Sequence, residues 1–437
     1  MGGRKGSRES HHSSRRPSAS DSSRKNTLLK DSDLLALHSS RSIETLDVFD
    51  ALQKMDSTHS LSSLMNAAEV KKEDIDRINQ SIHSIPSTFM EESSAVKTAR
   101  KLFQEGVISQ EELAECVAND AKFQHHQAEA AHLDLEFGVA AAFGEGWEAK
   151  AARVRRESPH GRHEGWELHS LIVKSNDDLR QEVCMIQMIE LCQHIFLAAG
   201  IDLWLRPYRI ISTSATTGLI ETISDAMSLD ALKKREGHVS LADHFEKTYG
   251  PEDSAQREQS MKNFVQSLAA YSLICYIFSI KDRHNGNILL DTEGHIVHID
   301  FGFILGIAPG GYWSMETCPF KLTEEMVEAM GGPRGRWFME FVVGFTCGFL
   351  ALQEQADRIA GVVEIMARGS PFPCFAGRGA DGDDPAPAVR AFRARFAPGL
   401  AKEQVVAHCL DLIKASYNHY GMKQYDNFQW FTNGIMP

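Results

Sequence analysis

KDRHNGNILLDTEGHIVHIDFG, residues 281–302, brings three aspartates, three histidines and two asparagines into one short stretch. Its runs NILLD and HIVHID favour β-strands, and DTEG between them is a turn sequence, so the stretch predicts a β-hairpin. Asp282 and Asn287 come before the hairpin, and Asp300 ends it. Acids at both ends of one hairpin indicate either part of a catalytic site or a polar hairpin whose side chains bond to one another.

The spacing of these acids is typical of phosphoryl transfer. Asp282 lies five residues before Asn287, and Asp300 begins a literal Asp-Phe-Gly. Protein kinases place a catalytic Asp five residues before a magnesium-binding Asn, with a metal-binding Asp-Phe-Gly after a hairpin. We therefore expect Asn287 and Asp300 to hold Mg²⁺ against the phosphates of ATP. A nearby histidine, His284 or His298, is expected to take a hydroxyl proton or face the developing charge.

A second constellation precedes the hairpin. LHSLIVK, residues 168–174, reads as a strand ending in Lys174, and a helix is predicted from about residue 178 to 196. Glu182 shares one stripe of that helix with apolar residues, namely Met185, Ile189, Cys192 and Phe196. A carboxylate on an apolar stripe is costly unless it is paired. We therefore predict a Lys174–Glu182 pair of the kind that kinases use, with a surface Glu beside an extended Lys as the alternative.

No glycine-rich kinase loop precedes Lys174. The GxGxxG sequence at 377–382 lies in a Gly/Pro loop without a strand before it or a helix after it, so we expect no phosphate binding there. ESPHG, residues 157–161, predicts instead a turn between two strand-like pieces. Its backbone amides and the Ser158 hydroxyl are expected to contact phosphates.

Several stretches together resemble one protein family. DRHxxN and HIDFG resemble the phosphatidylinositol 3- and 4-kinase superfamily and differ from ordinary protein kinases. Longer stretches are similar to phosphatidylinositol 4-kinases of the type III beta class, across roughly residues 143–437. They are SPHGRHEGWELHSLIVKSNDDLRQEVCMIQM (158–188), LWLRPYRIISTSATTGLIETISDAMSL (203–229), FKLTEEMVEAMGG (320–332) and YDNFQWFTNGIM (425–436).

This resemblance implies a two-lobed α+β kinase fold, with a β-rich N-lobe and a mainly helical C-lobe. It also implies ATP and Mg²⁺ as cofactors, and phosphorylation of the inositol 4-hydroxyl of phosphatidylinositol in membranes. By the same resemblance Lys174 contacts the phosphates and Glu182 is its partner. Tyr208 is expected near the adenine, and Glu221 and Ile223 are expected to form the adenine hinge through backbone groups.

The resemblance further places Asp282 and His284 in the catalytic loop, with Asn287 and Asp300 on magnesium. Two positions depart from the family pattern. The hinge reads Glu-Thr-Ile where Pro-Val usually follows the Glu, and Asn176 replaces a common Gly. Neither departure removes a catalytic group.

The segment after Asp-Phe-Gly, residues 303–322, is called the activation segment below. It contains only two charged residues, Glu316 and Lys321. A head group that already carries phosphomonoesters would require several cations. We therefore expect Lys321 to contact the single phosphodiester of phosphatidylinositol. The alternative is that Lys321 caps the following helix, TEEMVEAM.

The chain divides by composition into three parts. Residues 1–60 are rich in Ser and basic residues and predict a disordered tail, either simply solvated or able to bind lipid or a partner. Residues 61–142 predict a helical lead-in, and 143–437 the catalytic domain, with 371–388 as a loop insertion. The aromatic residues near the end of the chain predict core packing, with a membrane interface as the alternative. They are Tyr425, Phe428, Trp430 and Phe431.

Charge and cysteine usage exclude other classes. A formal charge of −13 argues against a nucleic-acid binder. The eight cysteines include no CxxC pair, which is typical of a reducing compartment. The longest apolar runs, such as 341–352, are too short to span a membrane.

We expect a cytoplasmic enzyme that is peripheral on intracellular, Golgi-like membranes. Whether its regulator is a small GTPase or an adaptor stays open. The alternatives are a related protein kinase, a lipid 3-kinase and a non-catalytic scaffold.

Overall fold

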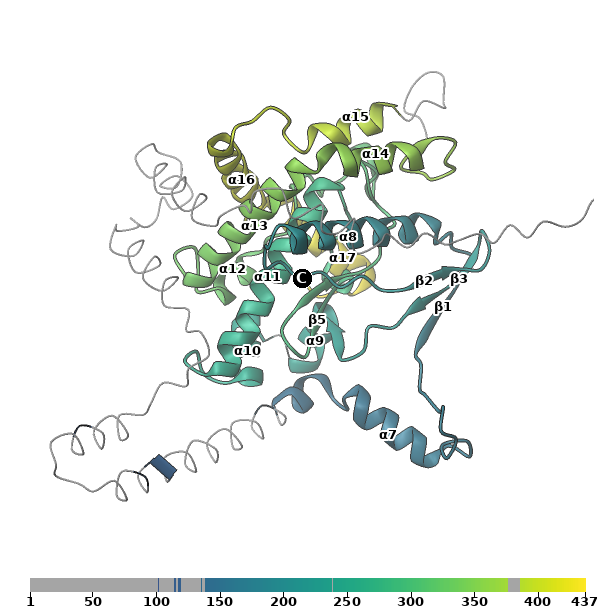
Figure 1. Cartoon of the computed structure of the whole chain (residues 1–437), viewed down its shortest axis with the longest axis vertical. Coiled ribbons are helices and arrows are strands. Elements are labelled where there is room, and N and C mark those ends of the chain that lie inside the picture. Colours follow the sequence, from purple (N-terminus) through teal and green to yellow (C-terminus); the bar gives the residue numbers. More distant parts are fainter. Residues whose placement is uncertain are drawn as a thin grey trace, which may run out of the picture. The chain divides into compact units, whose positions relative to one another are not determined.

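The computed structural model describes residues 138–237, 239–375 and 386–437, together with single helical positions at 101, 114, 117, 118 and 135. The predicted tail, most of the predicted helical lead-in and the part of the 371–388 loop at 376–385 lie outside the described residues. The domain boundaries drawn from composition therefore stay predictions. The described residues form helices and two three-stranded sheets (Figure 1), which confirms the predicted α+β fold class.

The first sheet has the strand order β1-β3-β2 and is antiparallel. Its strands are β1 (Leu171–Ser175), β2 (Ile210–Ser212) and β3 (Thr217–Glu221). β1 is the strand predicted to end in Lys174, and Lys174 pairs with Gly218 in the register. Helix α8 (Arg180–Ala198) packs beside this sheet (Figure 1) and matches the helix predicted from about 178 to 196.

The second sheet contains the predicted hairpin. β4 (Ala226–Ser228) pairs with β5 (Ile288–Asp291), and β5 pairs with β6 (Ile296–His298), all antiparallel. The turn is closed by Asp291, whose Oδ1 accepts the backbone N–H groups of Glu293 and His295 at 2.9 and 2.8 Å. Gly294 has a φ of 94°, which favours glycine. Residues 222–225 link the first sheet to the second.

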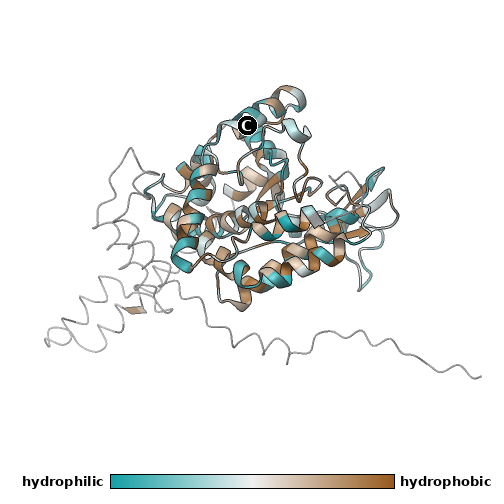
Figure 2. Cartoon of the chain, turned by 90° about the horizontal axis from the view of Figure 1, so that it is seen from above, coloured by the Kyte–Doolittle hydropathy of each residue, from teal (hydrophilic) through white to brown (hydrophobic). Residues whose placement is uncertain are grey.

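Most of the regular structure outside the two sheets is helical. The helices after the first sheet are α9 (Leu229–Glu236), α10 (Leu241–Tyr249), α11 (Ala255–Ile277), α12 (Glu324–Ala329), α13 (Arg336–Glu354), α14 (Ala356–Ala367), α15 (Ala386–Ala394), α16 (Lys402–Ser416) and α17 (Tyr420–Asn433). α11 is buried on nearly all sides, as expected of a central core helix. Figure 2 shows that other helices carry apolar and polar residues on different sides. Over the described residues, no helix is both long enough and apolar enough to span a bilayer.

Several helix starts follow directly from the sequence. The side-chain hydroxyls of Ser228, Ser240, Ser254 and Thr323 each accept the backbone N–H three residues on, at the beginnings of α9 to α12. Such N-caps satisfy backbone donors that the helix itself leaves without partners. These four capping residues therefore mark where the helices begin.

One predicted element is wrong. The piece before the ESPHG turn was expected to be a strand, but residues Trp147–Glu157 form helix α7. Its sequence, WEAKAARVRRE, is dominated by Ala, Lys, Arg and Glu, which favour helix. Arg155 and Arg156 lie in its last turn, where basic side chains interact favourably with the helix dipole.

A matched pair of glycines tests the packing of α13 on α11. A β-carbon at Gly348 of α13 would lie 2.5 Å from methyl carbons of both Leu203 and Leu273, whereas one at Gly361 of α14 would meet open space. We expect Gly348→Ala to destabilise the protein by about 1–2 kcal/mol, because overpacking outweighs the gain in helix propensity. Gly361→Ala should instead stabilise it by up to about 1 kcal/mol. Urea unfolding measures both, and equal stability of Gly348→Ala and the wild type would contradict the close approach.

Candidate active site

The loop at 281–287, between α11 and β5, and the turn after β6 bring the predicted acids to one region. Asp282 and Asp300 are both non-glycine residues with positive φ, at 66° and 60°. Such conformations cost on the order of 1–3 kcal/mol each and persist only where the surroundings determine them. The contacts of these two residues therefore explain the geometry of the site.

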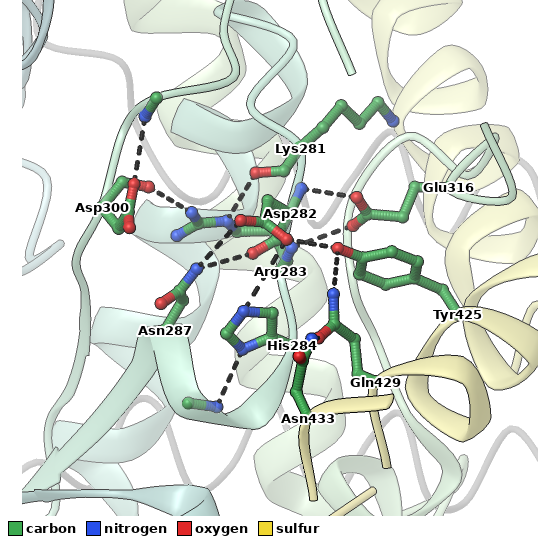
Figure 3. Close-up of polar contacts among 12 residues, drawn as sticks. Lys281, Asp282, Arg283, His284, Asn287, Asp300, Glu316, Tyr425, Gln429 and Asn433 are labelled. Carbon is green, nitrogen blue, oxygen red and sulfur yellow. Dashed lines mark hydrogen bonds and ion pairs between the residues drawn. The ribbon is translucent and has the colours of Figure 1, made fainter. Parts of the chain in front are cut away.

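Asp282 is held on its side chain and on its backbone (Figure 3). Asn287 Nδ2 donates to the Asp282 carbonyl at 3.0 Å and lies 3.4 Å from Oδ2, while the Tyr425 hydroxyl donates to Oδ1. The backbone N–H groups of Asp282 and Arg283 both donate to the Glu316 carboxylate. Successive backbone N–H groups around one residue of positive φ form an anion-binding concavity, and Glu316 supplies the anion.

Arg283 connects the two acidic segments. Its side chain is buried and lies 5.7 Å from the ring centre of Phe301. Its guanidinium donates to three backbone carbonyls, those of Lys281, Ile299 and Asp300. Arg283 was not among the predicted site residues, although it stands between Asp282 and His284 in the sequence. One buried cation thus fixes the distance between the 281–287 loop and the Asp-Phe-Gly turn.

Asp300 is exposed, and the turn that it begins is held by its own side chain and by α8. Its Oδ1 accepts the Gly302 N–H at 3.2 Å. From α8, Gln181 Nε2 donates to the carbonyls of Phe301 and Gly302 at 3.2 and 2.8 Å. Gln181 is buried, and it was not among the predicted site residues. The available signal was a polar residue at a position that falls on the buried, mostly apolar face of α8.

The predicted Lys174–Glu182 ion pair is not formed directly. Lys174 Nζ lies 3.9 Å from Asp177 Oδ2, and Glu182 Oε1 accepts the Tyr208 hydroxyl at 2.8 Å. Lys174 nevertheless acts on Glu182 through its charge, which lowers the pKa of the Glu182 carboxyl. Burial dominates and raises that pKa above its usual value, and the charge of Asp300 adds to the rise.

Tyr208 was expected near the adenine, and the structure places its side chain in the core. This side chain is buried, donates to Glu182 and stacks on Phe301 with ring centres 6.4 Å apart. It therefore connects α8 to the Asp-Phe-Gly turn inside the core.

The two predicted histidines lie in different surroundings. His284 Nδ1 accepts the Gly286 N–H at 3.1 Å, so its proton sits on Nε2, which lies 3.7 Å from Asp282 Oδ1. Burial lowers the pKa of His284, and Asp282 partly offsets this. His298 is instead buried in the core, stacked 4.8 Å from the Tyr271 ring, and burial holds its pKa well below the usual value. The prediction of a catalytic His298 is therefore not supported, because β6 directs this side chain inward.

The predicted hinge residues lie on the link between the two sheets. Glu221 ends β3, and its carboxylate accepts the Arg209 N–H at 2.8 Å and lies 3.3 Å from Arg206. Ile223 follows, partly buried against the core, and among the described residues nothing hydrogen-bonds its backbone groups. Ser158 is not brought to this region: it ends α7, where its hydroxyl accepts the His160 N–H at 3.2 Å.

Lys321 was expected to contact the phosphodiester of the substrate, and the structure places it in a buried polar contact. It is buried, and its Nζ donates to Asn285 Oδ1 at 3.0 Å and to Asp426 Oδ1 at 2.8 Å. It therefore has no free face for a substrate phosphate. The alternative prediction is wrong as well, because Thr323 caps the following helix. Both charges of the activation segment, Glu316 and Lys321, point into the protein.

The aromatic residues of α17 divide between two environments. Tyr425 is buried against Asp282, as core packing predicted. Phe428, Trp430 and Phe431 are exposed, at 47%, 55% and 90%. In the activation segment, Tyr312 and Trp313 are also almost fully exposed. The exposed aromatics thus lie on two neighbours of the 281–287 loop.

Comparison with known proteins agrees with this geometry. Residues 169–370 match the family model of phosphatidylinositol 3- and 4-kinases, so the chain contains a kinase domain of this family. Within the family it is similar to phosphatidylinositol 4-kinases of the beta type. It is 44% identical over 298 residues to phosphatidylinositol 4-kinase beta 1 of Arabidopsis thaliana and 41% identical over 303 residues to phosphatidylinositol 4-kinase beta of Xenopus tropicalis. The resemblance predicted from the motifs is confirmed.

These matches cover 67% and 69% of this chain. They cover a smaller share of the relatives, 26% and 36% respectively. A phosphatidylinositol 4-kinase of Dictyostelium discoideum is 42% identical over 294 residues, which are 67% of this chain and 24% of that protein. The chain thus spans about a quarter to a third of the length of the curated relatives it matches.

The burial of Glu182 predicts a pH-dependent stability. In the folded protein the pKa of Glu182 lies above the ordinary value of 4.5. As pH rises, the unfolded chain therefore loses the Glu182 proton before the folded protein does. The free energy of unfolding then falls as pH rises from the unfolded pKa to the folded pKa. Glu182→Gln should therefore gain stability relative to the wild type as pH rises from about 4 to 7. Urea unfolding across this range measures the difference. Glu190→Gln, which removes an exposed carboxylate of the same helix, is the control. A flat difference for Glu182→Gln would contradict the assignment.

The buried contact of Lys321 makes a second prediction. Lys321→Met leaves the Asp426 carboxylate buried without its cation and should cost about 3–5 kcal/mol of unfolding free energy. The double variant Lys321→Met/Asp426→Leu should recover most of that loss. Chemical denaturation measures both. A single variant of normal stability that only raises KM for lipid would restore the predicted substrate role.

Proposed function

We propose that this chain carries the catalytic part of a phosphatidylinositol 4-kinase. The enzyme would transfer the γ-phosphoryl group of ATP to the inositol 4-hydroxyl and so produce phosphatidylinositol 4-phosphate for membrane signalling and trafficking. The carrying observation is the joint placement of Asp282, His284, Asn287 and Asp300 by Arg283 and its neighbours. The matched kinase family and the names of the relatives support the same reaction.

The side chains fit a magnesium ion. The Asp300 carboxylate is exposed, and Asn287 uses Nδ2 toward Asp282, which leaves its amide oxygen available. Carboxylate and amide oxygens suit Mg²⁺, which keeps further ligands from water and nucleotide phosphates. The described residues contain no group of three or more His, Cys, Asp or Glu able to hold a metal alone. Asn287 and Asp300 would hold the ion, which when bound neutralises charge on the phosphates.

The nucleotide would lie between the two sheets. Lys174 is half-buried and near the carboxylates of Asp177 and Glu182, so its ammonium is available for phosphates. The backbone N–H and C=O of Ile223, on the link after Glu221, suit an adenine edge because they have no hydrogen bond to the described residues. Ser158 and Tyr208 have no part in this proposal.

Asp282 and His284 would handle the proton. Asp282 Oδ2 is proposed to accept the proton of the inositol hydroxyl. The hydroxyl oxygen bonds to the γ-phosphorus at the same time, and the bond from that phosphorus to ADP breaks. His284 keeps its proton on Nε2, and its lowered pKa keeps the ring neutral. It would therefore donate a hydrogen bond to the developing charge and not accept the proton.

The proposed substrate is phosphatidylinositol in a membrane surface. Because Glu316 and Lys321 point inward, the activation segment presents no charge of its own, which suits a head group without phosphomonoesters. Exposed Tyr312 and Trp313 suit a membrane interface. A peripheral enzyme on an intracellular, Golgi-like membrane, recruited by a small GTPase or an adaptor, completes the proposal and rests on resemblance alone.

Incorporation of labelled γ-phosphate from Mg-ATP into phosphatidylinositol vesicles, with the phosphorylated position resolved, tests the proposal. We expect a 4-phosphate product that Asp300→Ala reduces by about 10³-fold or more, because the exposed metal-binding carboxylate is lost. Asp357→Ala, which removes a fully exposed carboxylate of α14, is the matched control and should retain full activity. Product on the 3-hydroxyl would indicate a lipid 3-kinase, transfer to protein a related protein kinase, and no transfer a scaffold.

A further inference from the structure

α17 carries a chain of three polar side chains that ends on Asp282. Asn433 Nδ2 donates to Gln429 Oε1 at 2.7 Å, Gln429 Nε2 donates to the Tyr425 hydroxyl at 2.7 Å, and that hydroxyl donates to Asp282 Oδ1. Figure 3 shows the three residues on one side of the helix, facing Asp282. Their spacing of four residues places them on one face, and all three bonds run in one direction.

The two members nearest Asp282 are buried, where apolar residues would otherwise be expected, whereas Asn433 at the far end is exposed. Tyr425 and Gln429 are 3% and 7% exposed. A buried hydroxyl or amide is costly unless its hydrogen bonds are made, and bonded groups in a low-dielectric interior polarise one another. Burial and the neighbouring Asp282 both raise the pKa of Tyr425, so its hydroxyl stays a donor.

We infer that Tyr425 is a positioning residue for Asp282, and that Gln429 and Asn433 direct its hydroxyl toward the carboxylate. The inference rests on the proposed function, because its main consequence is measured in phosphoryl transfer. It adds to that function a requirement that a side chain of α17 be in place at the reacting loop.

Orientation of this carboxylate needs an external contact. The last torsion of an aspartate is broad and roughly two-fold, so the backbone alone does not decide where each oxygen points. The bond from Tyr425 fixes Oδ1, which leaves Oδ2 beside Asn287. Glu316 meanwhile holds the backbone N–H of Asp282. Side chain and backbone are thus held by two different segments.

The position of α17 does not depend on the Tyr425 hydroxyl. Asp426 forms the buried ion pair with Lys321, and Asn285 Nδ2 donates to the Met436 carbonyl at 3.0 Å. The aromatic ring of residue 425 packs with Cys318 and Met422. Tyr425→Phe therefore removes one hydroxyl and leaves the helix docked.

The test compares Tyr425→Phe with Tyr276→Phe in the phosphatidylinositol vesicle assay. Tyr276 is the matched control, since its hydroxyl is also bonded inside the protein, to His408 at 3.3 Å, away from the site. We expect kcat of Tyr425→Phe to fall about 10- to 100-fold, as for a lost hydrogen bond to a charged group. KM for ATP and the urea midpoint should match those of the control. The fall in kcat should be smaller for Gln429→Leu than for Tyr425→Phe, and smallest for Asn433→Ala.

Hydrogen exchange of the backbone amides at 282–287 gives a readout that needs no activity. Tyr425→Phe should speed exchange there severalfold, and Tyr276→Phe should not. An active wild type with unchanged kcat in Tyr425→Phe overturns the inference and leaves the proposed function standing. A wild type that makes no lipid product overturns the proposed function, and the exchange comparison then decides the inference by itself. A higher KM with an unchanged kcat in Tyr425→Phe also overturns the inference.

Discussion

The site depends on the buried guanidinium of Arg283. It donates to backbone carbonyls on both sides of the second sheet's hairpin, among them those of Lys281 and Asp300. A buried cation without a bonded carboxylate is stabilised only when its donors are satisfied, and here peptide dipoles satisfy them. Loss of this group would release the Asp-Phe-Gly turn from the loop that carries Asp282, so the two acids would no longer share one site.

Around that centre, each strained acid is held by segments distant in sequence. Glu316 of the activation segment and Tyr425 of α17 fix Asp282, and Gln181 of α8 holds the carbonyls that follow Asp300. Positive φ at both acids is therefore maintained by tertiary contacts and not by local sequence. The same contacts make the geometry of the site sensitive to the packing of three separate elements.

The sequence predicted the local features well. The hairpin, β1 and α8 follow from periodicity and turn residues. Asp282 and Asn287 lie in contact because both belong to one short loop. The errors concern side-chain direction. Lys321 meets Asp426, more than a hundred residues away, and no local pattern announces that pairing. His298 pairs with Ile288 across the hairpin, and which face is the core was decided by α11. Residues before Ser158 form a helix and not the expected strand, because their sequence is rich in helix-forming residues.

The grip of Gln181 on the Asp-Phe-Gly turn has a consequence for inhibitor chemistry. A compound that requires this turn to swing outward must break both bonds from Gln181 and the bond from Arg283 to the Asp300 carbonyl. Any such ligand loses that free energy from its affinity, because only the rarely populated open form binds it. Compounds that bind while the turn stays in place carry no such penalty.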